Sequence, residues 1–376
     1  MTRRDSKRKF SSDAALFLES SMNIGGQELQ LLQQMSELQQ RGWRTRLICK
    51  PTSRIYALAK ERGLDVAAAR FRNALHLPSI FTVRQHLREL NAAAVIVHSG
   101  HDANIGAIAS RLCGLQRPLI IRMRTYQPGV PSSLPYRYLF DHTLACSAHL
   151  RGRILKNPKI LSSKVGVLYP GIDFAQIEAN AQHAELPRQA AEWLKNRPGP
   201  VMLQGAMLRE EKGHAVILQA MPVILKQHPQ LRFLIAGEGH LQPVLQAMIE
   251  ELGLQEHACV LGMINPMVGL LRRADLAILP SLSEPFGMFQ IEALNLGIPT
   301  IASDTDGIPE TMAHQEDGLL VAAGDVAAWS VSISWALTHL EQMRTWAAHG
   351  QQKNRARFSV AQNTNQLIAL IRGAVK

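Results

Sequence analysis

The sequence predicts an α/β protein made of two doubly wound parallel sheets. Short apolar runs alternate with amphipathic stretches along most of the chain, which is the pattern of a parallel sheet covered by helices. This pattern occurs twice, because a polar, weakly patterned stretch separates two series of similar length. A length of 376 residues also favours two domains, at about 150 residues per domain as a soft prior.

We expect four parts along the chain. A first Rossmann-like domain covers 1–175, a linker covers 176–199, a second Rossmann-like domain covers 200–355, and a last helix covers 356–376. Open parallel sheets bind their ligands beyond the carboxyl ends of the strands. We therefore expect the two domains to face each other across a cleft that holds the ligand.

The individual elements follow from the apolar runs and the turn residues between them. In the first half the expected strands are 14–18, 45–49, 93–97, 119–122, 143–147 and 165–170. Gly42 ends the first helix, and Gly114 ends a helix that begins near Ile105. In the second half the expected strands are 201–204, 232–236, 259–261, 276–280 and 300–302, with long helices at 215–226 and 327–347.

Composition excludes several classes of protein. With 46% hydrophobic and 19% charged residues, each half can bury a sizeable core. No apolar run approaches the roughly 18 residues of a membrane-spanning helix, and the N-terminus leads into no signal-peptide pattern. The four cysteines are widely separated and form no C-x-x-C pair. We expect a cytoplasmic protein without disulfides or a zinc site.

The formal charge of +11 is concentrated in the first half. The first ten residues carry five basic side chains and one acidic one, a net +4, and the segment from Arg111 to Lys164 carries ten against Asp141, a net +9. Such segments suit an anionic membrane surface, a phosphorylated acceptor or nucleic acid. A solvated face with internal ion pairs is the alternative.

Two carboxylates bracket a predicted helix start in the second half. Glu284 lies in a loop after the apolar strand, and Glu292 lies two turns into the helix that begins near Gly287. Free N–H groups at a helix start favour a diphosphate, and carboxylates accept hydrogen bonds from sugar hydroxyls. We expect Gly287, Met288 and Phe289 to bind the same donor. Taken alone, either glutamate is better explained as a complement to the helix dipole or as an exposed helix charge.

This segment resembles the E-x7-E signature of the retaining glycosyltransferases of family 4. Gly307 to Glu310 resembles the GG-x-P-E turn of that family, with Asp306 in place of its first glycine. The resemblance implies a GT-B fold, a nucleotide-sugar donor with UDP or GDP, and a lipid-linked or envelope glycan acceptor of the lipopolysaccharide type. It also implies that the last helix crosses back to the first domain. Glu284 would then hold the sugar and Glu292 the ribose.

Two glycine-containing loops extend the resemblance. Gly25 and Gly26 resemble the loop through which the backbone approaches the donor phosphate and the acceptor. The segment from Gly205 to Gly213 resembles G-R-L-x-x-x-K-G, whose cations clamp the diphosphate. Lys212 matches the family lysine, whereas Arg209 lies closer to it than the family arginine does. We expect no metal ion, because we find no D-x-D between apolar strands, and Lys212 with helix N-termini can offset the diphosphate charge instead.

The first half supplies further candidates. His98 follows a strand and resembles the family histidine beside the transferred sugar, with His101 as the alternative. Arg122 and Arg124 lie in a segment that resembles the variable acceptor side, and guanidinium groups suit phosphate or carboxylate recognition. Pairing within the fold is the alternative for both arginines.

The sequence therefore predicts a metal-independent, retaining glycosyltransferase, in the cytoplasm or on the cytoplasmic face of the inner membrane. A sugar-nucleotide epimerase or hydrolase with the same fold would share the donor but lack the acceptor. A dinucleotide-dependent oxidoreductase is disfavoured, because no G-x-G-x-x-G opens either first helix. A nucleic-acid-binding protein would suit the basic charge, but aromatic residues make up only 5% and no known binding module occurs.

Overall fold

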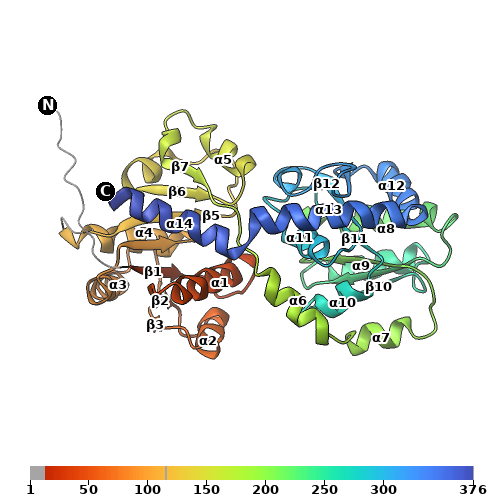
Figure 1. Ribbon diagram of the computed structural model, residues 1–376, viewed down its shortest axis with the longest axis horizontal. Coiled ribbons are helices and arrows are strands. Elements are labelled where there is room, and N and C mark those ends of the chain that lie inside the picture. The colour runs from red at the N-terminus through yellow and green to blue at the C-terminus, as the bar shows by residue number, and fades with distance from the viewer. Residues whose placement is uncertain (1–12, 115–116, 376) are drawn as a thin grey trace. The chain divides into compact units, whose positions relative to one another are not determined.

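The computed structural model describes residues 13–114 and 117–375, and it divides into two compact units. Unit 1 contains the residues up to Ile172 and those from Phe358 onward, and unit 2 is Asp173–Arg357. Each unit is a parallel sheet with helices on both faces, so the predicted fold class is confirmed (Figure 1). The basic first ten residues lie outside the described ranges.

The sheet of unit 1 has the strand order β3-β2-β1-β4-β5-β6-β7, with all neighbours parallel. Its strands are β1 (Ala14–Glu19), β2 (Arg44–Cys49), β3 (Val66–Ala68), β4 (Ala94–Val97), β5 (Leu119–Arg124), β6 (His142–Ala145) and β7 (Val165–Val167). The order reverses between β1 and β4, where Leu18 is opposite Val97. The carboxyl ends of these two strands therefore emerge side by side.

Alternate residues of β1 pack on two different helix layers. Ala15 and Phe17 face one core with α1, α2 and α14, whereas Leu16 and Leu18 face the other core with α3 and α4. The helices of unit 1 are α1 (Gly26–Gln40), α2 (Arg54–Glu61), α3 (Leu77–Leu90), α4 (Gly100–Arg111), α5 (Ala148–Leu155) and α14 (Val360–Val375). Figure 1 shows α14, in blue, lying along α1.

The sheet of unit 2 has the order β10-β9-β8-β11-β12-β13, again with parallel neighbours. Its strands are β8 (Val201–Gly205), β9 (Arg232–Ala236), β10 (Ala258–Gly262), β11 (Leu276–Leu279), β12 (Thr300–Asp304) and β13 (Leu319–Ala322). The order reverses between β8 and β11. In open α/β sheets, ligands bind beyond the strand ends at such a reversal.

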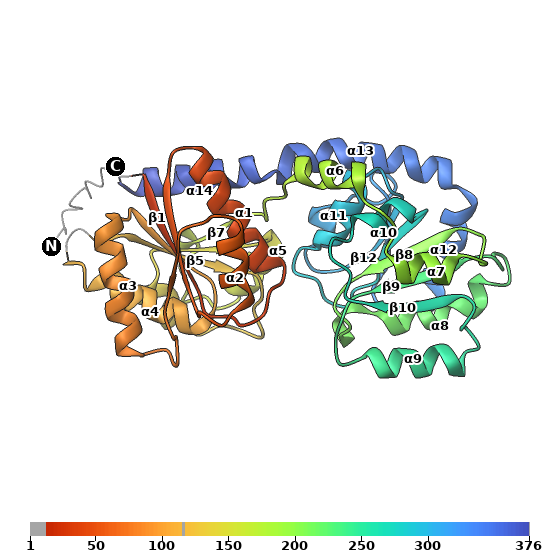
Figure 2. The ribbon, with the colours of Figure 1, turned by 90° about the horizontal axis from the view of Figure 1, so that it is seen from below.

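Helices cover both faces of this sheet as well (Figure 2). They are α6 (Phe174–His183), α7 (Arg188–Leu194), α8 (His214–Ile224), α9 (Gln242–Glu251), α10 (Val268–Arg273), α11 (Met288–Asn295), α12 (Val326–Thr338) and α13 (Leu340–Phe358). One core gathers around Phe233 and Trp329, and the other around Leu203 and Leu294. None of the helices in the described ranges is both long and apolar enough to cross a membrane.

The structure differs from the sequence expectations in several places. The expected linker at 176–199 forms most of α6 and all of α7, which belong to unit 2, and Ala190 of α7 is fully buried. The expected helix at 327–347 ends at Thr338, and α13 begins two residues later. No element was predicted where the structure has β3, α3, α5 and β13.

Candidate functional site

The two loops at the strand reversal of unit 2 bring Lys212 and Glu284 together. Lys212 lies in the loop after β8 and Glu284 in the loop after β11. The ammonium Nζ of Lys212 is 2.6 Å from Oε2 of Glu284, and the two side chains are 19% and 13% exposed. The pair is therefore largely shielded yet still reachable by a ligand. The sequence named both residues but did not predict their contact.

Hydrogen bonds from β8 and from the loop after β11, together with one close backbone approach, position the loop that carries Lys212. The amide of Leu282 donates to the carbonyl of Glu211 at 2.8 Å, and Nε2 of Gln204 donates to the carbonyl of Lys212 at 2.8 Å. Gly213 has a φ of +67°, and a Cβ there would lie 1.9 Å from the carbonyl oxygen of Pro280. Only glycine fits this approach. The position of Lys212 is thus fixed by the loop that carries Glu284.

Asp306 secures Glu284 from the third loop. Its Oδ2 accepts hydrogen bonds from Oγ of Ser283 at 2.5 Å and from the amide of Glu284 at 3.1 Å. Its φ is +48°, in the left-handed region that aspartate tolerates better than most residues. This residue stands where the resembled turn has glycine. The substitution therefore keeps a glycine-like backbone and adds a side chain that orients the Glu284 loop.

Helix α11 places the remaining donor-side candidates beside this pair. Gly287 precedes the helix with a φ of +83°, and Met288 is half-buried. Phe289 is buried against Gly205, whose added Cβ would lie 2.5 Å from the ring. Glu292 is half-buried one turn further along, and burial raises its pKa to about 7. Glu292 therefore titrates near neutral pH rather than remaining fully ionised.

Arg209 does not join the Lys212–Glu284 pair. Its side chain is 52% exposed, and its guanidinium is 3.9 Å from Oε1 of Glu211. The neighbouring Leu208 is fully buried and Met207 is partly exposed. The structure thus leaves the cation of Arg209 at the rim of the loop, and its role as a substitute for the family arginine stays a prediction.

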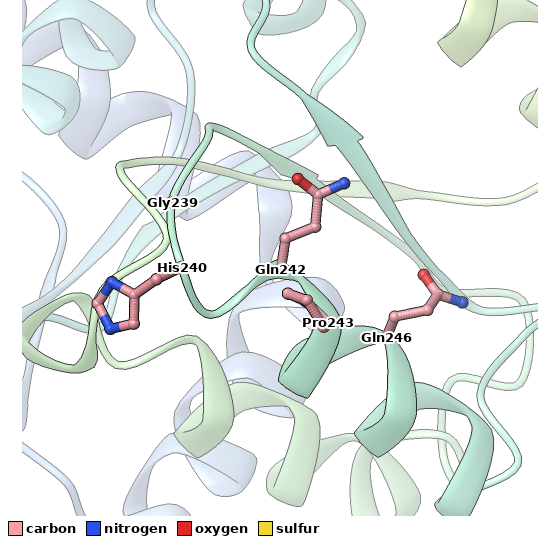
Figure 3. Close-up of a pocket in the computed structure, with 5 residues that line it drawn as sticks. All are labelled: Gly239, His240, Gln242, Pro243 and Gln246. Atoms are coloured by element: carbon pink, nitrogen blue, oxygen red, sulfur yellow. The ribbon is translucent and has the colours of Figure 1, made fainter.

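A polar hollow lies at the start of α9, next to the same loop (Figure 3). It has a volume of about 540 Å³ and is lined by Gly239, His240, Gln242, Pro243 and Gln246. Gly239 packs on this loop so closely that a Cβ would lie 2.2 Å from the carbonyl oxygen of Leu208. His240 is 2.9 Å from Glu210. The sequence analysis did not anticipate this hollow.

In unit 1, His98 lies at the strand reversal, directly after β4. It is buried, its amide donates to Oδ2 of Asp102 at 2.8 Å, and its Nδ1 lies 3.1 Å from the carbonyl oxygen of Leu18. A carbonyl can only accept, so Nδ1 carries the proton and Nε2 is left as an acceptor. Burial lowers the pKa of His98, which keeps the ring neutral. His101, the alternative, is exposed on α4.

Gly25 and Gly26 form the start of α1 after β1. The amide of Gly25 donates to Oε2 of Glu28 at 2.9 Å, which satisfies one of the free amides at the helix start. A Cβ on Gly26 would meet nothing within 4 Å, and neither glycine has a positive φ. The protein's own packing therefore does not require glycine at Gly26.

Two buried carboxyl groups, Glu19 and Asp102, lie beside these residues and were not predicted from the sequence. Glu19 ends β1, and its side chain accepts from the amide of Ser21 at 2.8 Å and from Nε2 of Gln27 at 2.9 Å. Gln27 in turn accepts from Oγ1 of Thr125 at 2.8 Å. Burial, together with the nearby charge of Asp102, raises the pKa of Glu19 to about 8. The sequence signal that could have identified Glu19 is a glutamate directly after an apolar run.

Both acceptor-side arginines contact neighbouring groups of unit 1. The guanidinium of Arg122 lies 4.9 Å from the ring centre of Phe140 and 5.9 Å from that of Tyr136. Burial lowers the pKa of Arg122 to about 10, so it remains a cation at neutral pH. Arg124 donates to Oε1 of Gln127 at 2.5 Å. Each arginine also keeps a buried Nε without a partner among the described residues.

Much of the basic segment from Arg111 to Lys164 serves the fold rather than a free surface. Arg117 and Asp141 form an ion pair at 2.7 Å. Including this pair, half of its ten cations bind groups within unit 1, namely Arg111, Arg117, Arg124, Arg151 and Lys164. The uneven charge of the sequence therefore overstates the basic surface that this segment presents.

Asp304 and Asp306 form a D-x-D pair at the end of β12, before β13, so the expectation that no such pair occurs between apolar strands is wrong. Two carboxylates at this spacing can ligate a divalent cation. Asp304 is exposed, whereas Asp306 is engaged by Ser283 and Glu284. No cluster of three metal-ligating side chains occurs within 13–114 and 117–375.

Comparisons with known proteins agree with the resemblance. The chain is 29% identical to the D-inositol 3-phosphate glycosyltransferase of Segniliparus rotundus over 222 residues, which cover 57% of this chain and 48% of the relative. The chain thus spans about half the length of the curated relatives it matches.

Solved structures match over nearly the whole chain. A glycosyltransferase from Rickettsia africae superposes with a TM-score of 0.84 at 16% identity, over 98% of this chain and 100% of that structure. Anabaena Alr3699/HepE in complex with UDP superposes with a TM-score of 0.80 at 20% identity, over 96% and 100%. These likenesses show the fold, which is GT-B.

Two family descriptions match successive parts of the sequence. Glycosyltransferase Family 4 matches residues 24–176, in unit 1 and the first residues of unit 2, and Glycosyl transferases group 1 matches residues 187–353 of unit 2. The second match includes both strands of the reversal in unit 2, β8 and β11, whereas the first match includes β4 but begins after β1. The chain belongs to the group 1 glycosyltransferases of family 4.

Proposed function

We propose that this protein transfers a sugar from a nucleoside diphosphate sugar to a lipid-linked or phosphorylated glycan of the lipopolysaccharide type, with retention and without a metal ion. The contact between Lys212 and Glu284 carries this proposal. One N–H of the ammonium is taken by Glu284, which leaves two for diphosphate oxygens. Glu284 can meanwhile accept hydrogen bonds from the hydroxyls of the transferred sugar.

The proposed reaction needs no nucleophilic side chain. The acceptor hydroxyl attacks the anomeric carbon on the face from which the diphosphate departs, and its proton passes to the leaving phosphate oxygen. Lys212 stabilises the negative charge that develops there, with Arg209 at the loop rim as a second cation. His98, through its free Nε2 lone pair, accepts a hydrogen bond from a sugar hydroxyl. Glu292 accepts from the ribose.

Two observations support the donor class. A Cβ at Gly26 would enter open space, so the absence of a side chain there suits close approach of a ligand. Anabaena Alr3699/HepE, which shares the fold, was solved with UDP, and this favours UDP as the nucleotide.

The acceptor class rests on Arg122 and Arg124, and the named activity of the relative on D-inositol 3-phosphate agrees with a phosphorylated acceptor. Such an acceptor would place the enzyme at the cytoplasmic face of the inner membrane.

The donor site is tested by thermal shift with UDP, GDP and ADP. A ligand that binds only the folded state stabilises it by ~2.7 kcal/mol at a hundredfold excess over Kd. We expect stabilisation by UDP that Lys212→Ala abolishes and that the exposed control Lys226→Ala retains. No shift with any of the three nucleotides, from a folded protein, would refute the donor site.

The reaction is tested with UDP-glucose and a detergent-solubilised lipid glycan fraction. Retention predicts that the product keeps the anomeric configuration of the donor, as measured by NMR, and that a chelator leaves the rate unchanged. Epimerised or hydrolysed donor in the absence of acceptor would instead identify the epimerase or hydrolase alternative.

A further inference from the structure

Three large apolar side chains project from one short segment of unit 1. Leu75 and Leu77 are 67% and 63% exposed, and Phe81 is 56% exposed. Leu75 lies just before α3, and Leu77 and Phe81 lie within it. Apolar side chains gathered in this way on a surface mark a contact with another molecule or a membrane more often than isolated ones do.

Helix α3 has two distinct apolar faces. Ile80, Val83 and Leu87 are buried against the sheet of unit 1. At 100° per residue, Leu77 and Phe81 lie about 110° around the helix from that buried face. Arg84 and Arg88 continue the exposed stripe at the next turns, at positions i+7 and i+11 from Leu77. The stripe therefore combines apolar residues at one end with cations at the other.

The local charge is uniformly positive. The stretch 66–88 contains four arginines and no aspartate or glutamate. The carboxylates that flank it, Asp65 and Glu89, are both bound by Arg46, at 2.8 and 3.2 Å. Together with Arg46, the four arginines carry five positive charges against these two carboxylates, which leaves a net charge of +3 in this region.

The stripe continues onto α4, which lies beside α3 (Figure 2). The guanidinium Nε of Arg84 donates to the carbonyl of Leu112 at 3.0 Å. Leu112 is itself 46% exposed. This contact places the cation of Arg84 beside an exposed apolar side chain at the end of α4.

We infer that this patch docks on an anionic lipid bilayer. The α3 surface, as we define it, consists of Arg72, Leu75, Leu77, Phe81, Arg84 and Arg88. Apolar side chains that enter the interface, beside arginines that attract anionic headgroups, are the combination that binds a protein to the surface of a membrane. The inference extends the proposed lipid-linked acceptor, but it depends only on lipid binding.

The test uses the full chain and flotation with two kinds of vesicle, phosphatidylcholine alone and phosphatidylcholine with phosphatidylglycerol. We expect binding to the anionic vesicles that weakens with added salt. Leu77→Ser with Phe81→Ser should lower the partition coefficient by about tenfold or more, as should Arg72→Gln with Arg88→Gln. Exposed positions such as these tolerate substitution without loss of the fold.

Matched control variants replace similarly exposed residues elsewhere in the chain. Val244→Ser with Val331→Ser removes apolar side chains that are 58% and 69% exposed, and Lys195→Gln with Lys226→Gln removes exposed cations. Both controls should bind vesicles like the wild type. The inference is overturned if the wild type does not float, if the α3 variants float equally well, or if the controls lose as much binding.

Two further measurements distinguish lipid binding from self-association and from failure of the proposed function. Sedimentation of the Leu77→Ser, Phe81→Ser variant checks for self-association; conversion from dimer to monomer with unchanged flotation would overturn the inference in favour of a second copy of the chain. Stabilisation by UDP is measured on every variant. Lost flotation with retained UDP stabilisation assigns the defect to lipid binding, whereas flotation without UDP stabilisation by the wild type refutes the proposed function alone.

Discussion

The carboxylate of Asp306 accepts a hydrogen bond from the backbone amide of Glu284 at 3.1 Å, across 22 residues of sequence. The side chain of Glu284 in turn binds Lys212. The three loops that follow β8, β11 and β12 are therefore joined through consecutive polar contacts. A substitution of Asp306 should consequently alter the position of the Lys212 side chain.

We predict a graded response to substitutions of Asp306. Asp306→Ala should be the most destabilising, by about 1–3 kcal/mol, because it loses the acceptor and places alanine at a φ of +48°. Asp306→Gly keeps the backbone free and loses only the acceptor, so it should cost less. Asp306→Asn should be mildest. Urea unfolding of the three variants measures the order, and equal losses would contradict a role for the backbone angle.

Gly213 offers a test of the close contact beneath Lys212. Gly213→Ala should lower the free energy of unfolding more than Gly253→Ala does, although both glycines have a φ of +67°. A Cβ on Gly213 would lie 1.9 Å from the carbonyl oxygen of Pro280, whereas one on Gly253 meets nothing within 4 Å. Gly253→Ala should cost about 1–2 kcal/mol for the backbone angle alone. If calorimetry gives both variants the same melting temperature, the overlap with Pro280 is unimportant.

The raised pKa of Glu19 should make stability depend on pH. Between the unfolded value of 4.5 and the folded value of about 8, the folded protein keeps a proton that the unfolded chain releases. The contribution of this group to the free energy of unfolding therefore falls as pH rises, by at most about 1.4 kcal/mol per pH unit.

Glu19→Gln should remove this pH dependence. Urea unfolding at pH 5, 6, 7 and 8 should show wild type losing stability relative to the variant, with the difference levelling off above pH 8. Glu61→Gln, at an exposed position, should run parallel to wild type. A Glu19→Gln profile parallel to wild type would show that Glu19 is ionised in the folded protein.

Glu292 should link donor binding to pH. Its pKa of about 7 means that the carboxylate, the form that accepts from ribose hydroxyls, gains population as pH rises through neutrality. Affinity for UDP-glucose should therefore increase between about pH 6 and 8 and then level off. Isothermal titration calorimetry measures this, with Glu292→Gln expected to flatten the profile. A decrease in wild-type affinity over that range would exclude the assigned role.

Much of the fold could be predicted because the apolar runs are long. Residues 14–18 and 276–280 are continuous apolar strands that lie in the middle of their sheets. Strand β3 is only three residues long, and its sequence, Val-Ala-Ala, carries too little pattern to be distinguished from a turn. Helices α6 and α7 were predicted as linker because each buries few residues: only Phe174 and Ala190, respectively, are fully enclosed.

The sequence could predict which residues belong to the candidate site, but not which of them contact each other. Lys212 and Glu284 are separated by 72 positions, and only the strand order brings them together. Glu19 was missed because a lone glutamate after a strand resembles a solvated loop charge. The basic segment was overestimated for a similar reason, since a sequence does not show that Arg151 is bound by the carbonyl of Val165.

Unit 1 consists of two stretches of chain. They meet where the chain passes into unit 2 and where it returns from unit 2. The amide of Ile172 donates to the carbonyl of Phe358 at 2.7 Å, and the amide of Val360 donates back to Ile172 at 3.0 Å. Leu367 and Ile371 of α14 complete the core around β1. During synthesis these residues leave the ribosome after all of unit 2. The core of unit 1 therefore stays incomplete until α14 has been made, whereas unit 2 can finish folding before that.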